Sequence, residues 1–242
     1  MTDSLAATSN PDIAKRAGTT FAIETYKQLR EDIINAVLEP GKKLRIRDIC
    51  VRYATGLSPV REALSRLSSE GLVEQSAQRG FTVASFSLAD LEELIRTRHW
   101  IDEKGLRESI LRGDQAWEEN VVLTYYRLSR TARYTEEGSV VRNPAWYEAH
   151  KRFHVSLVDA CGSEWLKRFS LTLFDAMERY RALSRTPGIL RSGHLDEHRA
   201  IMEATVARDS ELAVKLMSDH FAKTGQLVHD KLSENARAKP LR

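Results

Sequence analysis

Four histidines in the second half of the chain have the residue type and spacing of metal ligands. His150 and His154 are four residues apart, so on a helix they lie one turn apart on the same face. Apolar residues continue that face in both directions, which indicates that it is buried. His198 and His220 share helical faces with apolar residues in the same way. Three predicted helices therefore direct histidines toward the interior.

A group of buried histidines points to a bound divalent cation. A single inward histidine is more often a hydrogen-bonded core residue, but several neutral imidazoles in a dry interior are costly without partners. A cation such as Zn²⁺ satisfies three or four of them at about 2.0–2.1 Å. An all-nitrogen site favours Zn²⁺, Ni²⁺ or a similar ion over Mg²⁺ or Ca²⁺. The sequence leaves open whether His150 binds the metal or an effector, and His194, four residues before His198, is a weaker alternative ligand.

An arginine on a predicted buried face is the second group with evident chemistry. Arg98 follows apolar residues at helical spacing, which turns its guanidinium toward the interior, where a buried charge needs a partner. Asp102, one turn later, can be that partner. Alternatively, Arg98 binds a carboxylate bidentately beside the metal, and Tyr180 and Arg181 add a second anion contact. In that case the ligand is a small carboxylate, with a dicarboxylate as one candidate.

Basic residues gather in the first third of the chain. Residues 42–66 carry seven lysines and arginines against two acidic residues, which makes them a candidate surface for DNA phosphates. Ile23, Tyr26, Ile33 and Val37 recur at helical spacing and predict a first helix that begins near Phe21 and ends at the Glu39-Pro40-Gly41 turn. Apolar periodicity predicts a short second helix over residues 46–53, and Gly56 breaks it. Ser58 is suited to the N-cap of the next helix and Pro59 to its first position. Two short helices joined by a tight glycine turn are typical of a helix-turn-helix.

The second of these helices has the features of a DNA recognition helix. Arg61 and Arg66 fall largely off its apolar stripe, near the exposed face that would enter a major groove. Alternating residues at 72–74 and 81–83 then predict two short strands around a basic tip at Arg79. Together these elements predict a winged helix-turn-helix.

The wider pattern divides the chain into two domains and two ends. Beyond Ser87 it is helical almost throughout, with helices expected over residues 88–111, 116–134, 145–161, 164–184, 194–207 and 210–232. The predicted fold class is mainly α, with an antiparallel helical bundle after the winged domain. The expected divisions are a flexible arm (1–20), the winged domain (21–86), the effector and metal domain (87–235) and a flexible tail (236–242).

A dense set of residues between 26 and 83 carries a family resemblance. They are Tyr26, Leu29-Arg30, Ile33, Pro40-Gly41, Leu44, Pro59-Val60-Arg61-Glu62-Ala63-Leu64, Leu67, Glu70-Gly71-Leu72-Val73 and Arg79-Gly80-Phe81-Thr82-Val83. In them the chain resembles the DNA-binding domain of the GntR family of repressors. The resemblance implies that Arg45 and Arg61 contact the major groove, and that Gly80 lets the wing approach the minor groove. Leu57 stands where the family usually has a base-contacting arginine. The full expected DNA-binding set is Arg45, Ser58, Arg61, Arg66, Arg79 and Gly80.

The second domain carries a resemblance of its own. The segments are Phe153-His154-Val155-Ser156-Leu157, Glu197-His198-Arg199-Ala200-Ile201 and Met217-Ser218-Asp219-His220. They resemble the FCD domain of the FadR-type branch of the same family. The resemblance implies that His154, His198 and His220 hold a metal, with His150 in place of the usual carboxylate. It also matches Arg98 to an arginine that binds small organic acids.

Composition and missing motifs restrict the other classes of function. Hydrophobic residues at 42% and charged residues at 29% are typical of a globular protein, and no apolar run approaches the ~20 residues of a membrane span. We expect a cytoplasmic homodimer that represses transcription from a pseudo-palindromic operator. The alternative is a helical-bundle metalloenzyme acting on a small organic acid. His150 lacks the following glutamate of a zinc protease, and no nucleophile elbow or phosphate-binding glycine loop occurs, so we do not expect an enzyme.

Overall fold

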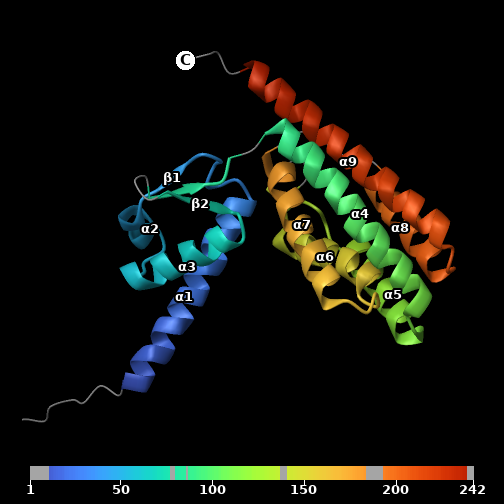
Figure 1. Cartoon of the computed structure of the whole chain (residues 1–242), viewed down its shortest axis with the longest axis horizontal. Coiled ribbons are helices and arrows are strands. Elements are labelled where there is room, and N and C mark those ends of the chain that lie inside the picture. The colour runs from blue at the N-terminus through green and yellow to red at the C-terminus, as the bar shows by residue number, and fades with distance from the viewer. Residues whose placement is uncertain (1–10, 77–79, 86, 137–140, 184–192, 239–242) are drawn as a thin grey trace, which may run out of the picture. The chain divides into compact units, whose positions relative to one another are not determined.

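The computed structural model describes residues 11–76, 80–85, 87–136, 141–183 and 193–238, and the chain divides into two compact units (Figure 1). Residues 1–86 form the first unit and residues 87–242 form the second. The described part of the first unit combines helices with a small sheet, whereas that of the second is helical. The predicted fold class, a winged helix-turn-helix followed by a helical bundle, is confirmed.

The first unit contains the predicted helix-turn-helix and wing. Its elements are α1 (Pro11–Ile34), β1 (Lys43–Leu44), α2 (Ile46–Arg52), α3 (Leu57–Ser69), β2 (Val73–Ser76) and β3 (Gly80–Val83). The strands pair antiparallel in the order β1-β3-β2, so Thr82 of β3 faces Lys43 on one side and Glu74 on the other. Strands β2 and β3 form the wing. The pattern did not predict β1, because two residues are too few to show alternation.

The core of the first unit holds α3 against α1. Leu29 and Ile33 of α1, and Leu64 and Leu67 of α3, are at most 2% exposed and belong to one apolar cluster. Burial of such side chains stabilises a fold by about 1.5–3 kcal/mol each. The opposite face of α3 is left in solvent, where Arg61 lies.

The first helix starts earlier than predicted. It begins at Pro11 rather than near Phe21, so part of the segment predicted as a flexible arm is helical, while residues 1–10 lie outside the described part. Proline is tolerated in the first turn of a helix, and residues 14–17 are good helix formers. These local preferences account for the longer helix.

The N-cap of α3 was assigned to the wrong residue. The helix begins at Leu57 and its N-cap is Gly56, so Ser58 lies inside the first turn. The first helical hydrogen bond runs from the Val60 N–H to the Gly56 carbonyl at 3.3 Å. Glycine ranks only slightly below serine as an N-cap, so the shift is inexpensive.

The described part of the second unit is an antiparallel bundle. Its helices are α4 (Leu88–Arg112), α5 (Gln115–Ser129), α6 (Pro144–Val158), α7 (Glu164–Leu183), α8 (His194–Val206) and α9 (Ser210–Ala238). The predicted start of α4 is confirmed, because the Ser87 hydroxyl accepts a hydrogen bond from the Asp90 N–H at 3.0 Å. Helix α5 ends at Ser129, short of the predicted residue 134. Helix α9 runs to Ala238, past the predicted end near residue 232 and into the predicted tail.

Five helices of this unit share one apolar core. Leu106 of α4, Val121 of α5, Phe153 and Leu157 of α6 and Ile201 of α8 are fully buried in it, together with residues of α9. Helix α4 packs along α9, as Figure 1 shows, and also against α7. This packing brings the inward faces of α6, α8 and α9 together. None of the described helices has both the length and the apolar character needed to cross a membrane.

Candidate metal centre and nucleic-acid interface

The four predicted histidines meet inside the bundle. His150 and His154 come from α6, and His198 and His220 come from α8 and α9. They are 1%, 6%, 1% and 1% exposed, and one ring nitrogen from each lies within 4.8 Å of the others. The side chain of His194, the weaker alternative, lies outside the described part. The structure therefore assembles the complete candidate set from three helices.

Two separations between the ring nitrogens match those around a tetrahedral metal. Nε2 of His154 lies 3.1 Å from Nε2 of His150 and 3.3 Å from Nε2 of His198. Ligands at 2.0–2.1 Å from a tetrahedral Zn²⁺ are about 3.3–3.4 Å apart. A neutral ring nitrogen offers one hydrogen or one lone pair, so His154 Nε2 can hydrogen-bond to only one of its two neighbours. A cation satisfies all of the lone pairs at once.

A carboxylate orients one of the four rings. Nδ1 of His220 lies 2.8 Å from Oε2 of Glu197. When Nδ1–H donates to this carboxylate, the lone pair of His220 is on Nε2, the nitrogen available for coordination. Carboxylates that receive the outer N–H of a ligating histidine are a regular feature of protein metal sites.

Burial keeps the α6 histidines neutral. Burial lowers the pKa of His150 well below its usual range, and the nearby His154 imidazole adds to the effect. Burial likewise lowers the pKa of His154 well below its usual range, with Arg98 as the next cause. Neutral imidazoles have a free lone pair, which is the form that binds metal. This donor set fits Zn²⁺ or a similar ion of the same preference.

Aromatic rings hold His150 in place. The indole of Trp146 stacks on it with ring centroids 4.5 Å apart and planes 14° apart. Phe174 of α7 lies on another side, with centroids 5.4 Å apart. Because these contacts restrict the ring, its Nε2 stays directed at the other histidines.

Arg98 is buried beside the histidines and already has a carboxylate partner. The side chain is 2% exposed, and its Nε donates to Oδ2 of Asp102 at 3.1 Å. The centroid of the Phe221 ring lies 4.2 Å from the guanidinium carbon of Arg98. Burial raises the pKa of Asp102, an effect that the Arg98 charge opposes. The simpler prediction for Arg98, a partner one turn away, is thus confirmed as a contact.

A second buried group of charges surrounds Glu178 of α7. This residue is 1% exposed and pairs with Arg142, which is 8% exposed and precedes α6. Its Oε1 also accepts from Nη1 of Arg181 at 2.6 Å. Arg181 and Arg98 both line a small cavity with Thr224 and Phe221. Tyr180 does not line it, and burial, with the Asp90 charge as the next cause, raises the pKa of its hydroxyl to about 12.

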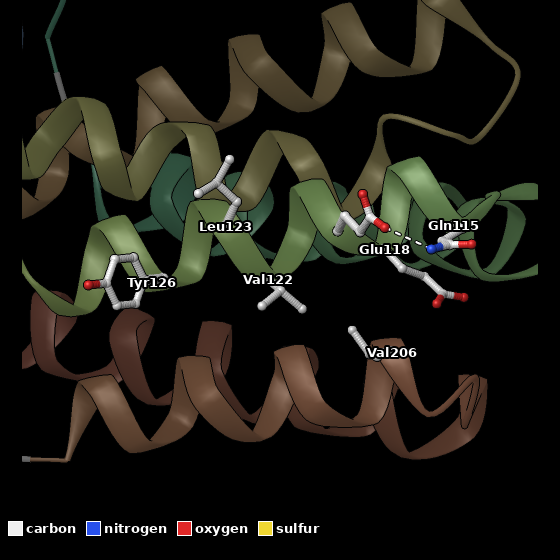
Figure 2. Close-up of a pocket in the computed structure, with 7 residues that line it drawn as sticks. Gln115, Glu118, Val122, Leu123, Tyr126 and Val206 are labelled. Atoms are coloured by element: carbon white, nitrogen blue, oxygen red, sulfur yellow. Dashed lines mark hydrogen bonds between the residues drawn. The ribbon is translucent and has the colours of Figure 1, made fainter.

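The cavity beside Arg98 is small in this structure. Its volume is about 10 Å³, roughly the space of one water molecule. A far larger hollow of about 760 Å³ lies between α5 and α8, lined by Val122, Leu123 and Tyr126 (Figure 2). It is an open, largely apolar groove that contains none of the four histidines or buried arginines. Chemistry therefore points to the smaller cavity as the candidate effector site.

The predicted DNA-binding residues of the first unit are exposed where the structure describes them. Arg45 is the N-cap of α2, and Arg61 lies on the solvent side of α3 together with Ser58. Gly80 begins β3 with φ of +77°, a conformation that favours glycine. Arg79 lies outside the described residues.

Arg66 is placed differently from Arg61. The two are five residues apart on α3, so they point about 140° apart around the helix axis. Arg66 packs over the Tyr26 ring with its guanidinium carbon 3.9 Å from the centroid, and its Nε lies 3.5 Å from Glu70. These contacts give Arg66 a role in joining α3 to α1.

Sequence reasoning did not single out three carboxylate and arginine residues of this site. Glu197 directly precedes His198, so its place in the same motif was a usable signal. Glu178 and Arg142 had no such signal, because their meeting depends on how α7 packs against the start of α6.

Comparison with known families and relatives agrees with the geometry. The FCD domain model matches residues 93–223, and the model of bacterial regulatory proteins of the gntR family matches residues 22–83. The uncharacterized HTH-type transcriptional regulator BphR of Paraburkholderia xenovorans (strain LB400) is 38% identical over 204 residues, which cover 84% of this chain and 83% of the relative. The HTH-type transcriptional repressor GlaR of Escherichia coli (strain K12) is 32% identical over 222 residues, 90% of this chain and 100% of the relative.

Solved structures show the same fold. E. coli McbR/YncC superimposes with a TM-score of 0.71 at 15% identity, over 88% of this chain and 98% of that chain. A putative transcriptional regulator GntR from Rhodococcus sp. RHA1 gives a TM-score of 0.68 at 20% identity, over 86% and 97%. GntR regulators bind operator DNA, and FCD domains bind small-molecule effectors. The alternative prediction of a metalloenzyme is therefore wrong. The chain belongs to the GntR family of transcriptional regulators, which are not enzymes, and its second unit is an FCD domain.

Proposed function

We propose that this regulator is a repressor whose operator binding responds to a small carboxylic acid held beside a divalent metal. The first unit binds a pseudo-palindromic operator as part of a homodimer, and the second unit is the sensor. The metal ligands are His150, His154, His198 and His220, and the anion contacts are Arg98 and Arg181.

The observation that carries the proposal is the convergence of four buried imidazoles. Two of their separations, 3.1 and 3.3 Å, suit a tetrahedral site, and burial keeps His150 and His154 neutral. Four nitrogen ligands favour Zn²⁺, with Ni²⁺ or a similar ion as the other candidate. When bound, such an ion supplies fixed positive charge, which attracts an acid to this part of the bundle.

The charges around the small cavity favour an anion with more than one carboxylate. Among the described residues, Arg98 pairs with Asp102, and Arg142 and Arg181 both pair with Glu178. A divalent cation held by neutral imidazoles would add two positive charges beside these pairs. Because uncompensated buried charge is costly, a dicarboxylate would balance the site better than a monocarboxylate.

Acid binding requires side chains to move, because the cavity beside Arg98 holds about 10 Å³. Arg181 lines that cavity, and its guanidinium can release the Glu178 carboxylate and bind the carboxylate of an incoming acid instead. The acid changes operator affinity only if it prefers one arrangement of the DNA-binding units to another.

Operator binding is assigned to the exposed arginines of α2 and α3. Arg45 and Arg61 are exposed, and Gly80 shapes the wing. In a dimer, two copies of α3 would enter successive major grooves about one helical turn apart. The basic surface adds affinity that falls as salt concentration rises.

Thermal-shift screening of the full chain tests the sensor role. The metal-free protein is loaded with Zn²⁺ or Ni²⁺ and then screened against small mono- and dicarboxylates. We expect the metal to raise the melting temperature and a dicarboxylate to raise it further, because a ligand that binds only the folded state stabilises it. Elemental analysis that finds no bound metal after loading would refute the metal site. Metal binding without stabilisation by any acid would refute the effector class.

A further inference from the structure

We infer that Glu178 is the carboxylate that positions His150 as the fourth metal ligand, and that Arg181 competes for it. This inference rests on the proposed metal site and assigns a role to residues that form no direct bond to the metal. It also connects the metal to the anion cavity through a single side chain.

One histidine of the cluster, His220, already has a carboxylate at its outer nitrogen. His220 directs Nδ1 to Glu197 at 2.8 Å, which leaves its Nε2 for the metal. Histidine ligands in proteins almost always donate their second N–H to a carboxylate, a carbonyl or water. The same requirement applies to His150, whose Nε2 faces His154 at 3.1 Å.

The outer nitrogen of His150 lacks such an acceptor among the described residues. Its Nδ1 is buried and forms no hydrogen bond there. The carboxylate facing it is Glu178, whose Oε1 lies 3.9 Å from Nδ1, about 1 Å beyond hydrogen-bonding distance. Coordination through Nε2 places the proton of His150 on Nδ1, so the group that needs an acceptor is directed at Glu178.

Glu178 does not reach His150 because two arginines hold it. Arg142 binds one carboxylate oxygen, and Arg181 binds Oε1, the oxygen nearer to His150, at 2.6 Å. Arg181 also lines the cavity beside Arg98. An acid that takes Arg181 would therefore release Oε1 to accept from His150, and each ligand would strengthen binding of the other.

The Glu178 carboxylate therefore links the metal site to the anion cavity, because its Oε1 accepts a hydrogen bond either from His150 or from Arg181. Helix α7 provides a matched control one turn earlier. Asp175 is also a buried carboxylate, but its partners are the Tyr147 hydroxyl at 2.7 Å and the Lys151 ammonium at 3.1 Å. Removing its charge tests whether any buried carboxylate on this helix has the same effect.

The experiment uses the full chain loaded with Co²⁺, which replaces Zn²⁺ and shifts the proton signals of its ligands. Each imidazole bound through Nε2 gives one exchangeable N–H signal in the proton spectrum, so four are expected. Glu178→Gln should move the signal that is missing in His150→Ala and leave the other three. In the Arg181→Gln background, where Arg181 no longer holds Oε1, Glu178→Gln should also weaken metal binding about 10- to 100-fold in competition with a chelator. Glu197→Gln should do the same to the His220 signal, and Asp175→Asn should change neither signals nor affinity.

Two further variants keep the test decisive. Glu178→Asp retains the negative charge that balances both arginines, but its shorter side chain moves the carboxylate away from His150. It should give the same result as Glu178→Gln, and it replaces Glu178→Gln in the test if Glu178→Gln does not fold. Arg181→Gln should slow the exchange of the His150 signal with water, because Glu178 is released. An unchanged His150 signal and affinity in both Glu178 variants, or an equal loss in Asp175→Asn, would refute the inference alone. Failure of the wild-type chain to bind Co²⁺ or Zn²⁺ would refute the metal site as well.

Discussion

The arginines of the two units stand in opposite environments. In the first unit, Arg45 and Arg61 are exposed on the helix-turn-helix. In the second, Arg98 and Arg142 are 2% and 8% exposed and each faces a buried carboxylate. Arginine is therefore placed in this chain for two different kinds of anion. Exposed guanidiniums suit a long polyanion whose binding depends on salt, whereas buried guanidiniums suit one small anion that can replace a resident carboxylate.

This difference in burial also predicts different effects of substitution on binding and on folding stability in the two units. Removing an exposed arginine from the first unit should change DNA affinity with little effect on folding. Removing a partner of a buried arginine from the second should destabilise the fold itself, because the remaining charge loses its compensation.

The largest expected effect follows from breaking the buried pair. Asp102→Ala leaves the Arg98 guanidinium without its carboxylate and should lower the stability of the second unit by about 3–5 kcal/mol. Urea unfolding followed by tryptophan fluorescence measures the loss, because all four tryptophans belong to the second unit. Asp102→Asn keeps the shape and should lose less. A change below 1 kcal/mol in Asp102→Ala would mean that Arg98 does not depend on this partner.

Removing a histidine from the cluster should abolish metal binding. His198→Ala deletes a ligand that lies 3.3 Å from His154 Nε2, so metal content should fall from about one ion per chain to none, with loss of any response to acid. Elemental analysis of dialysed protein gives the content. His229→Ala, in a histidine outside the cluster, is the matched control. Equal metal content in His198→Ala and the wild type would reject this assignment.

Removing an exposed arginine should affect DNA and leave the second unit intact. Arg61→Ala should cost about 1–3 kcal/mol of specific operator binding, a loss of roughly 5- to 150-fold. A gel shift at fixed salt measures it, and metal content checks the second unit. Parallel loss of metal or acid binding would contradict the division of labour between the units.

Acid sensitivity should belong to the second unit, which contains all seven histidines. His150 and His154 have pKa values well below their usual range in the folded protein, so the unfolded chain binds more protons as the pH falls below about 6.5. The metal-free protein should therefore lose stability from that pH downward, by up to about 1.4 kcal/mol per pH unit for each histidine. Urea unfolding at several pH values measures this slope. His154→Leu should reduce it, and an unchanged slope would assign the acid sensitivity to other groups.

Local spacing predicted the histidine cluster but not the residues around it. The four-residue separation of His150 and His154, and the apolar periodicity around His198 and His220, placed all four on inward faces. Glu178 and Arg142 meet only through the packing of separate segments, which no local pattern records. The sequence therefore predicted the candidate metal-binding cluster more fully than the buried charges beside it.

Faces of helices were harder to predict where small or polar residues are buried. The apolar spacing that predicted the first helix includes Ile23 and Val37, yet they are 43% and 51% exposed. The buried stripe of α1 instead begins with Ala22 and Thr25, at 3% each. Neither residue stands out by hydrophobicity. The predicted face was therefore wrong at its start, and Val37 lies beyond the end of α1, whereas Ile33, at 2% exposed, lies in the core as predicted.

The smallest expected effect tests whether exposure alone makes an arginine a DNA contact. The Arg66 side chain is 57% exposed, but it lies on the Tyr26 ring and beside Glu70. Arg66→Ala should therefore lower the stability of the first unit by about 0.5–1 kcal/mol, the usual worth of an exposed cation–π contact. It should reduce operator affinity far less than Arg61→Ala does. Thermal unfolding and gel shifts on both variants measure the contrast. If Arg66→Ala weakened operator binding as strongly as Arg61→Ala without a loss of stability, both flanks of α3 would have to contact DNA, and the contact over Tyr26 would have to break on binding.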